Sequence, residues 1–315
     1  MITTEKIYFQ PDTLQEALEI ADKKIGRFKY IAGGTDLLVN KYQGNIEAEC
    51  LIDLTHINEL KEVKFDDDFL HIGSLVKLSE LKNHLIIKQE FPVLIEAANS
   101  VGSPLVRNSA TIGGNLLCEN RCLYYNQSEW WRDSAGYCLK CNGEICIVTG
   151  TGKACYSEFI ADTVPALISM NAKILVVDGT DEKTLNLQDI YTGDGVNPVD
   201  LNKTTIIRSI ILPRNRGYRS VFKKLRQRES LEYTSLTSAV SVDSEGNLII
   251  SLSGVDPKPV VVRGTVNSNR ETLIQEALKK SRSVDNDMLS RKYRKEMIKT
   301  YLKDSLKILI DKDGI

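Results

Sequence analysis

The sequence predicts a protein of mixed α and β structure, of the α+β class, and three observations lead to that expectation. Over 315 residues, segments with helical periodicity alternate with short apolar runs that are typical of strands. Two glycine loops stand beside such segments, at 33–36 and 109–115. Six of the seven cysteines lie between Cys118 and Cys155, in a stretch that interrupts the pattern. With 42% hydrophobic residues, the chain is long enough for two or three compact domains.

The N-terminal elements predict a helix, a strand and a second helix around the first glycine loop. Residues 11–22 predict a helix, since small and aliphatic side chains recur at helical spacing after a Pro-Asp start signal. The apolar run 28–32 predicts a strand that ends in the loop 33–36, and helical residues follow at 37–41. The face expected to be buried on the first helix consists of Leu14, Ala17, Leu18 and Ala21.

The rest of the chain continues the mixed pattern on both sides of the cysteine-rich stretch. Glycine, asparagine and proline concentrate at 191–203, and the segment 213–217 follows a strand, which places a domain boundary near residue 214. Two amphipathic helices are expected to end the chain. Before them we expect strands at 51–54, 70–73, 173–177, 206–212, 235–242 and 247–254, and helices at 78–85, 91–101 and 162–170.

The bulk charge excludes one class of partner. Lysine and arginine number 41 against 42 for aspartate and glutamate, so the chain lacks the basic excess that binding to a phosphate backbone requires. The first residues lack the pattern of a secretory signal, and no run of about 18 apolar residues occurs. We therefore expect no nucleic acid partner, no membrane insertion and a cytoplasmic location.

The two glycine loops are candidates for a diphosphate site. A diphosphate needs several backbone N–H groups at close range, and glycine permits tight turns and a near approach of the main chain. Two loops, at 32–36 and 111–115, can clamp one diphosphate from both sides. Each loop alone is equally well an ordinary turn. Neither has the Gly-x-Gly-x-x-Gly spacing of a Rossmann site or the Lys-Ser/Thr ending of a P-loop.

Three motifs resemble the FAD subunits of xanthine dehydrogenase and carbon monoxide dehydrogenase-like enzymes. They are Ile31-Ala-Gly-Gly-Thr-Asp-Leu-Leu38, Arg107-Asn-Ser-Ala-Thr-Ile-Gly-Gly-Asn-Leu116 and Asp162-Thr-Val-Pro-Ala-Leu167. The likeness covers nearly the whole chain. It implies a PCMH-type (vanillyl-alcohol-oxidase-like) FAD-binding domain of two α/β subdomains, at 1–58 and 59–213. A C-terminal α+β domain like that of carbon monoxide dehydrogenase flavoproteins follows at 214–315.

The same resemblance implies which residues bind FAD. The two loops hold the pyrophosphate, Asp162 lies toward the ribityl or ribose hydroxyls, and Ile207 and Lys223 lie near the isoalloxazine ring. A lysine there favours the anionic reduced ring, because an opposite charge stabilises the charged form. The loop residues implied are Ile31, Ala32, Gly33, Gly34, Thr35, Asp36, Leu37, Arg107, Thr111, Ile112, Gly113, Gly114 and Asn115.

The cysteine-rich insertion, at about 117–160, predicts a metal centre. Four thiolates suit either a tetrahedral zinc or a cubane [4Fe–4S] cluster, and the spacing alone leaves the metal open. The insertion resembles that of the flavin subunits of 4-hydroxybenzoyl-CoA reductases, most specifically at Arg121-Cys-Leu-Tyr-Tyr-Asn-Gln127. That resemblance implies a [4Fe–4S] cluster bound by Cys122, Cys138, Cys146 and Cys155, with Cys118 and Cys141 as spare thiols.

The function expected from these likenesses is electron transfer with FAD and a [4Fe–4S] cluster. The chain would relay electrons between a ferredoxin-like carrier and two partners, a molybdopterin-binding large subunit and a [2Fe–2S] small subunit, as a dimer of heterotrimers. A 4-hydroxybenzoyl-CoA reductase-like role in aromatic compound metabolism is the first hypothesis. The alternatives are the FAD subunit of a molybdenum hydroxylase acting on purines, aldehydes or N-heterocycles, and a stand-alone flavin oxidoreductase with a structural zinc.

Overall fold

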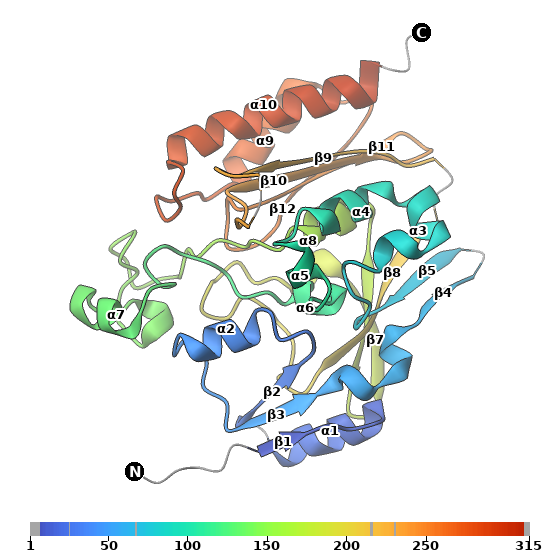
Figure 1. Ribbon diagram of the computed structural model, residues 1–315. Coiled ribbons are helices and arrows are strands. Elements are labelled where there is room, and N and C mark those ends of the chain that lie inside the picture. Colours follow the sequence, from blue (N-terminus) through green and yellow to red (C-terminus); the bar gives the residue numbers. More distant parts are fainter. Residues whose placement is uncertain (1–6, 25, 67, 215–216, 230, 312–315) are drawn as a thin grey trace.

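The described residues form three sheets, and each sheet is built from one consecutive stretch of the chain (Figure 1). The structure is a computed structural model that describes residues 7–24, 26–66, 68–214, 217–229 and 231–311. The N-terminal sheet lies at one end of the molecule and the C-terminal sheet at the other, with the second sheet between them (Figure 1).

The first sheet is parallel, with strand order β1-β3-β2. Its strands are β1 (Ile7–Phe9), β2 (Phe28–Ile31) and β3 (Cys50–Asp53), and its helices are α1 (Leu14–Lys23) and α2 (Leu37–Tyr42). Helix α1 begins after Thr13, whose hydroxyl accepts a hydrogen bond from the Glu16 amide at 3.2 Å. Its predicted face is buried at all four positions, so that prediction is confirmed.

The second sheet has five antiparallel strands in the order β4-β5-β8-β6-β7. These are β4 (Val63–Phe65), β5 (Phe69–Gly73), β6 (Lys173–Asp178), β7 (Asp181–Asn186) and β8 (Ile206–Pro213). The helices of this stretch are α3 (Leu85–Glu90), α4 (Pro92–Asn99), α5 (Pro104–Arg107), α6 (Ile112–Leu116) and α8 (Thr163–Ser169). Every residue of α8 is buried, which places it at the centre of the largest core.

The helix expected at 78–85 is wrong, because most of that segment is irregular. Only Leu81–Asn83 form a 3-10 turn, and α3 begins at Leu85. Leu78 and Leu81 are buried as their spacing suggests. The backbone amides, however, form hydrogen bonds to another segment of the chain. The amide of Leu78 donates to the carbonyl of Ala110, and that of Ser79 donates to the carbonyl of Arg107. Pairing with the segment before the second glycine loop thus replaces helical hydrogen bonds.

The third sheet is an antiparallel meander of order β12-β11-β10-β9. Its strands are β9 (Arg219–Leu225), β10 (Leu236–Val242), β11 (Asn247–Ser253) and β12 (Val260–Thr265). Helices α9 (Arg270–Lys280) and α10 (Arg291–Ile310) cover one face of this sheet, while α4 and α8 pack on the other face (Figure 1). The sheet therefore has a core on each side.

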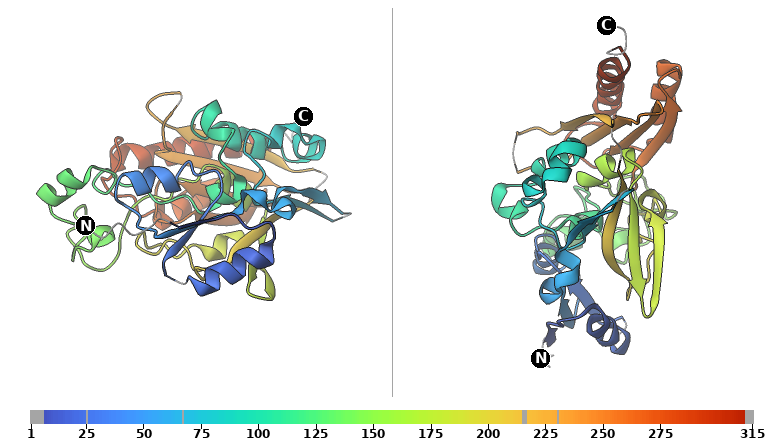
Figure 2. Two further views of the ribbon diagram at one scale, coloured as in Figure 1. Left: turned by 60° about the horizontal axis from the view of Figure 1, so that its bottom comes forward. Right: turned by 90° about the vertical axis from the view of Figure 1, so that its right-hand side faces the viewer.

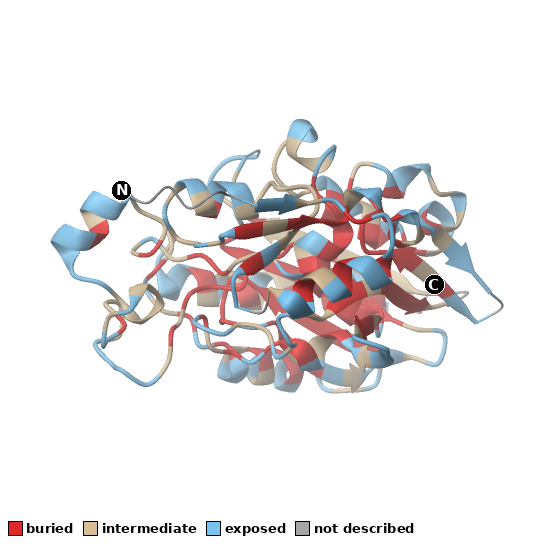
Figure 3. Ribbon diagram, turned by 90° about the horizontal axis from the view of Figure 1, so that it is seen from below, coloured by how far each residue is buried: buried red, intermediate tan, exposed pale blue. Residues whose placement is uncertain are grey.

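The cysteine-rich insertion projects from the side of the molecule with little regular structure. It contains the short helix α7 (Glu129–Ala135), which stands apart from the three sheets (Figures 1 and 2). None of the three hydrophobic cores of the described chain includes a residue of 119–158. Figure 3 shows that burial is concentrated in the sheets and their covering helices. Among the described residues, no helix is long and apolar enough to cross a membrane.

Candidate functional site

The structure brings the two glycine loops into direct contact. A Cβ atom on Gly33 would lie 2.0 Å from the carbonyl oxygen of Ser109, a distance that no real side chain allows. The main chain of the first loop therefore packs against the residues that lead into the second loop. This close approach requires glycine at position 33. It brings together at one site two segments that are distant in the sequence.

The first loop carries backbone amides that are free to bind an anion. No described residue accepts a hydrogen bond from the amides of Gly33, Gly34, Thr35 or Asp36. Gly34 has a φ of 70°, a left-handed conformation that favours glycine and turns successive N–H groups in one direction. The loop follows β2 and leads into α2, so both of its ends are fixed by regular structure.

The second loop uses its amides for the fold itself. The amide of Ile112 donates to Val76 at 2.9 Å, and that of Gly113 donates to Ser74 at 2.8 Å. The Gly114 amide is capped by the hydroxyl of Thr111 at 3.1 Å, and the Asn115 amide donates to the Thr111 carbonyl at 3.0 Å. Amide donors are thus available at the first loop, while the second loop supplies the surface against which the first is packed.

Asp162 lies at the start of α8 in a buried polar cluster. Its carboxylate accepts hydrogen bonds from Lys224 Nζ at 2.5 Å and from Thr237 Oγ1 at 2.8 Å. Burial raises the pKa of Asp162, against the opposing influence of Lys224. Lys224 also donates to the Ser100 carbonyl at 2.9 Å. The cluster joins α8, the third sheet and the loop after α4.

Lys223 lies on the opposite face of β9 from this cluster. Its Nζ atom is 2.9 Å from Asp304 of α10 and lies over the ring of Tyr301. Adjacent side chains of a strand point to opposite faces, so Lys224, and not Lys223, is the lysine on the side of Asp162.

The other residues implied by the resemblance lie in fixed structural positions. The guanidinium of Arg107 donates to the carbonyls of Val101 and Gly102, so it holds the loop after α4. Ile207 is buried in β8 opposite Val176. Cys118 lies near the first loop, where burial and the carboxylate of Asp36 raise the pKa of its thiol.

Four cysteines of the insertion line one cavity. They are Cys122, Cys138, Cys146 and Cys155, and the cavity between them is small, with a volume of about 10 Å³. Cys118 and Cys141 are not among its lining residues. The remaining walls are mainly apolar or aromatic, with Tyr124, Leu139, Ile147, Val148 and Tyr156 among them. The described residues contain no group of three or more His, Cys, Asp or Glu side chains arranged to hold a single metal ion.

The thiols of the cavity differ in acidity. Burial raises the pKa of Cys122 to about 11, and the nearby thiols of Cys155 and Cys138 act in the same direction. Burial also raises the pKa of Cys155. A hydrogen bond with the Cys141 thiol lowers the pKa of Cys138 to about 6. The four side chains therefore act on one another within a partly desolvated space.

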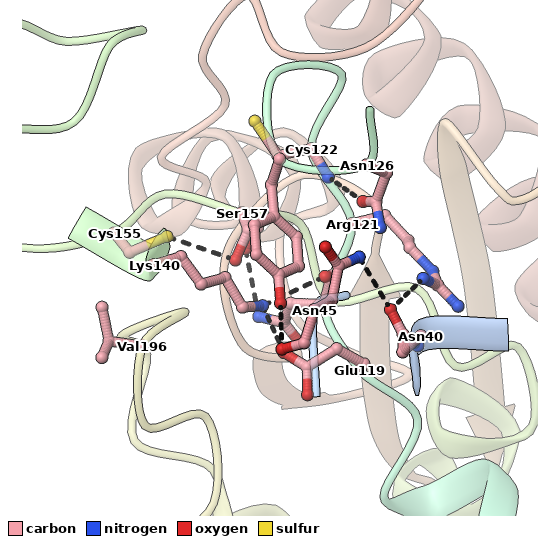
Figure 4. A network of polar contacts seen from close by, with 12 residues as sticks. Asn40, Asn45, Glu119, Arg121, Cys122, Asn126, Lys140, Cys155, Ser157 and Val196 are labelled. Atoms are coloured by element: carbon pink, nitrogen blue, oxygen red, sulfur yellow. Dashed lines mark hydrogen bonds and ion pairs between the residues drawn. The ribbon is translucent and has the colours of Figure 1, made fainter. Parts of the chain in front are cut away.

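Polar contacts, rather than a hydrophobic core, hold the cavity walls (Figure 4). Lys140 forms an ion pair with Glu119 and donates to the Asn120 carbonyl at 3.2 Å. The amide of Cys122 donates to Asn126 Oδ1 at 3.0 Å, while Asn126 Nδ2 is buried without a partner among the described residues.

Gly195, in the loop that follows β7, packs against two residues of the cavity wall, and no pattern in the sequence pointed to this position. A Cβ atom there would lie 1.9 Å from Ser157 Oγ and 2.9 Å from Cys155 Sγ. The Cys155 amide donates to Asp194 in the same loop at 3.0 Å. This contact could not be predicted from the sequence, because residues 194–195 are about forty positions away from Cys155, which they contact.

Comparisons with known proteins place the chain among FAD-binding subunits and domains. Relatives include the nicotinate dehydrogenase FAD-subunit of Eubacterium barkeri (27% identity, 76% of this chain and 70% of the relative). The aldehyde oxidoreductase FAD-binding subunit of Escherichia coli K12 is 29% identical over 80% of this chain and 82% of its own length.

Solved structures show the same fold. A carbon monoxide dehydrogenase from Hydrogenophaga pseudoflava, lacking the Mo-pyranopterin moiety of the molybdenum cofactor, matches with a TM-score of 0.73 and 20% identity over 97% of both chains. Quinoline 2-oxidoreductase from Pseudomonas putida 86 matches with a TM-score of 0.71 and 17% identity over 95% of both chains. The predicted fold class is thereby confirmed.

A family model described as the FAD binding domain in molybdopterin dehydrogenase matches residues 2–215, which include both glycine loops and the insertion. The loop with free amides and the match over most of the chain lead to the same conclusion. This chain belongs to the family of FAD-binding domains of molybdopterin dehydrogenases.

Proposed function

We propose that the chain is the FAD and [4Fe–4S] electron-transfer subunit of a multi-subunit molybdenum enzyme that resembles 4-hydroxybenzoyl-CoA reductase. The observation that carries the proposal is the gathering of Cys122, Cys138, Cys146 and Cys155 around one cavity. These thiols come from four separate places in the insertion, and the insertion directly follows the second glycine loop.

The residues of the glycine-loop site fit FAD. The free amides of Gly33 to Asp36 would bind the pyrophosphate, with the wall formed by Thr111 to Asn115 behind them. Asp162 would accept hydrogen bonds from the ribityl or ribose hydroxyls of FAD. Lys224, which pairs with Asp162, would then also interact with the isoalloxazine ring. The resemblance places Lys223 near the isoalloxazine ring, but its side chain pairs with Asp304 on the other face of β9. We propose Lys224, which pairs with Asp162, as the lysine of the site in its place.

The resemblance of the insertion to that of 4-hydroxybenzoyl-CoA reductase flavin subunits supports a cubane cluster over zinc at these thiols. In a cubane each of four thiolates binds a different iron atom, and the four cysteines that line the cavity match that number.

The partners of the chain follow from the same proposal. FAD exchanges two electrons and an iron–sulfur cluster one, so a subunit that holds both can convert between the two kinds of step. We propose a molybdopterin-binding large subunit and a [2Fe–2S] small subunit as its partners, in a dimer of heterotrimers, with a ferredoxin-like external carrier. Relatives named as subunits support an assembly of this kind.

A second candidate is the FAD subunit of a molybdenum hydroxylase that acts on N-heterocycles or aldehydes. The relatives named nicotinate dehydrogenase and aldehyde oxidoreductase favour it. The two candidates share the cofactors of this chain and differ in the large subunit. Assaying the co-purified complex with 4-hydroxybenzoyl-CoA, nicotinate and an aromatic aldehyde distinguishes them.

Metal and flavin analysis after anaerobic purification tests the cofactor set. We expect about four iron and four sulfide per FAD, as a Cys₄-bound cubane requires. Zinc without iron would instead leave a flavoprotein with a structural metal, and FAD without any metal would reject the cluster alone.

A further inference from the structure

Arg121 lies between the glycine-loop site and the cysteine cavity, and it contacts residues of both. It is the residue immediately before Cys122, and its side chain is about nine-tenths buried. It opens the motif 121–127 that carries the resemblance of the insertion, but the sequence assigns no role to its side chain. The inference drawn below rests on the proposed function, because it concerns both cofactors.

On one side, the guanidinium of Arg121 holds the first glycine loop. It forms an ion pair with Asp36, the last residue before α2, and its Nη1 donates to Asn40 Oδ1 at 3.1 Å (Figure 4). Asn40 is fully buried and donates back to the Asp36 carbonyl at 3.0 Å. Asp36 also accepts a hydrogen bond from the Glu119 amide at 3.0 Å. The position of the loop thus depends on contacts with the insertion.

On the other side, the main chain of Arg121 lies next to the cavity, between Cys122, which lines it, and Glu158. Its amide donates to Glu158 at 2.9 Å, and its carbonyl accepts from the Glu158 amide at 2.7 Å. Glu158 follows Tyr156 and Ser157, which line the cavity, and its side chain forms a buried ion pair with Arg294 of α10. The backbone at 121 is therefore joined to two segments that line the cavity.

The contacts of the Arg121 side chain depend on its planar guanidinium group. Its carbon Cζ lies 4.7 Å from the ring centre of Tyr233, and its Nε is buried without a partner among the described residues. Lysine would keep the charge but would lose the fork that binds Asp36 and Asn40 together. A displacement of this group would leave the Asp36 carboxylate without its buried partner, which is costly.

We propose that Arg121 is a positioning residue that couples the two cofactor sites. The hydrogen bonds to Glu158 hold the backbone at 121 from one side, and binding of the cluster to Cys122 adds a second anchor next to it. With both anchors in place, the guanidinium holds Asp36 and the free amides of the first loop in the arrangement that binds FAD. Loss of the cluster removes the second anchor and weakens FAD binding. Because coupling between binding sites is reciprocal, bound FAD slows loss of the cluster to the same thermodynamic extent.

The test compares FAD affinity with and without the cluster in the full-length chain. Cluster-loaded protein is purified anaerobically, and cluster-free protein is prepared from it with ferricyanide and EDTA. FAD dissociation constants are measured by flavin fluorescence for the wild type, Arg121→Gln and Arg121→Lys. We expect wild-type protein to bind FAD at least about fivefold more tightly when the cluster is present. The ratio falls to near one in Arg121→Gln and is intermediate in Arg121→Lys.

Arg294→Lys serves as the matched control. It also changes a buried arginine that pairs with a carboxylate beside the cavity, but it touches no residue of the first loop. It should lower the melting temperature and keep the wild-type ratio, whereas a merely structural role for Arg121 would make both variants alike. A ratio near one in the wild type, or an unchanged ratio in Arg121→Gln, overturns the coupling while the cofactor assignment stands. Wild-type protein without iron overturns both.

Discussion

The glycine-loop site and the cysteine cavity are neighbours, but they are built in opposite ways. The first loop lies between β2 and α2 and packs against Ser109, so its free amides are held by regular structure. The cavity is formed by side chains of an insertion whose residues 119–158 lie outside the three hydrophobic cores. A site made of backbone on a packed scaffold is preorganised. A site made of side chains on loops depends on its ligand for order, as small metal-binding domains do.

The largest difference between the two regions should appear when the cluster is removed. Chelation under oxidising conditions should abolish protection from hydrogen exchange across 119–158, because little apolar burial remains there to hold the backbone. The amides of β2, α8 and the third sheet should keep their protection. Mass-spectrometric hydrogen exchange on loaded and cluster-free protein measures this. Equal protection of the insertion in both forms would show that it is preorganised after all.

Substitution of the two lysines of β9, Lys223 and Lys224, tests the glycine-loop site separately from the cysteine cavity. Lys224→Met leaves the Asp162 carboxylate buried without its cation, and breaking such a pair costs about 3–5 kcal/mol. FAD affinity should fall with it, while iron content should not. Lys223→Met, the control one residue away, removes an exposed pair with Asp304 and should cost about 0.2–1 kcal/mol. Chemical denaturation and FAD titration measure both effects, and a larger effect at Lys223 would contradict the assigned faces.

Gly195 offers a way to disturb the cavity without touching a cysteine. Gly195→Ala places a methyl group against Ser157 and Cys155, and overpacking of this kind costs about 1–3 kcal/mol. Iron content should fall while FAD content stays near one per chain. Val196→Ala changes a partly exposed neighbour in the same loop and should retain iron. If both variants retain iron equally, the loop does not close the cavity.

The smallest expected effect concerns thiol reactivity in cluster-free protein. The pKa of Cys138 is lowered to about 6 by its hydrogen bond with Cys141, so at pH 7 it is mostly thiolate and reacts first with iodoacetamide. Cys122, with a pKa raised to about 11 by burial, is protonated there and reacts slowly. Lowering the pH through 6 should slow labelling at Cys138. Peptide mass spectrometry identifies the labelled residue, and earlier labelling of Cys122 would contradict the order.

Sequence patterns predicted the regular half of the molecule better than the insertion. The buried face of α1 follows directly from spacing, because helical periodicity reports burial. The segment 78–85 has the same apolar spacing, yet its amides bond to the chain before the second glycine loop. Periodicity therefore identified the buried residues there and not the backbone conformation, which long-range pairing decides.

The site was predictable where a motif is continuous and unpredictable where it is assembled from distant segments. Both glycine loops could be identified from the sequence, but the use of their amides depends on partners such as Ser74 and Val76. Lys223 and Lys224 differ by one position, and only the face of β9 distinguishes them. The roles of Arg121 and Gly195 could not be predicted, because each side chain or backbone position contacts residues far away in the sequence.

The central claim is that one chain holds two redox centres, and an anaerobic reductive titration tests it most directly. Dithionite is added to the purified chain while flavin absorbance and the EPR spectrum are recorded together. The account predicts uptake of about three electrons per chain, two for FAD and one for the cluster, with a cubane-type EPR signal. Uptake of two electrons with bleaching of the flavin and no EPR signal from iron and sulfur would contradict it.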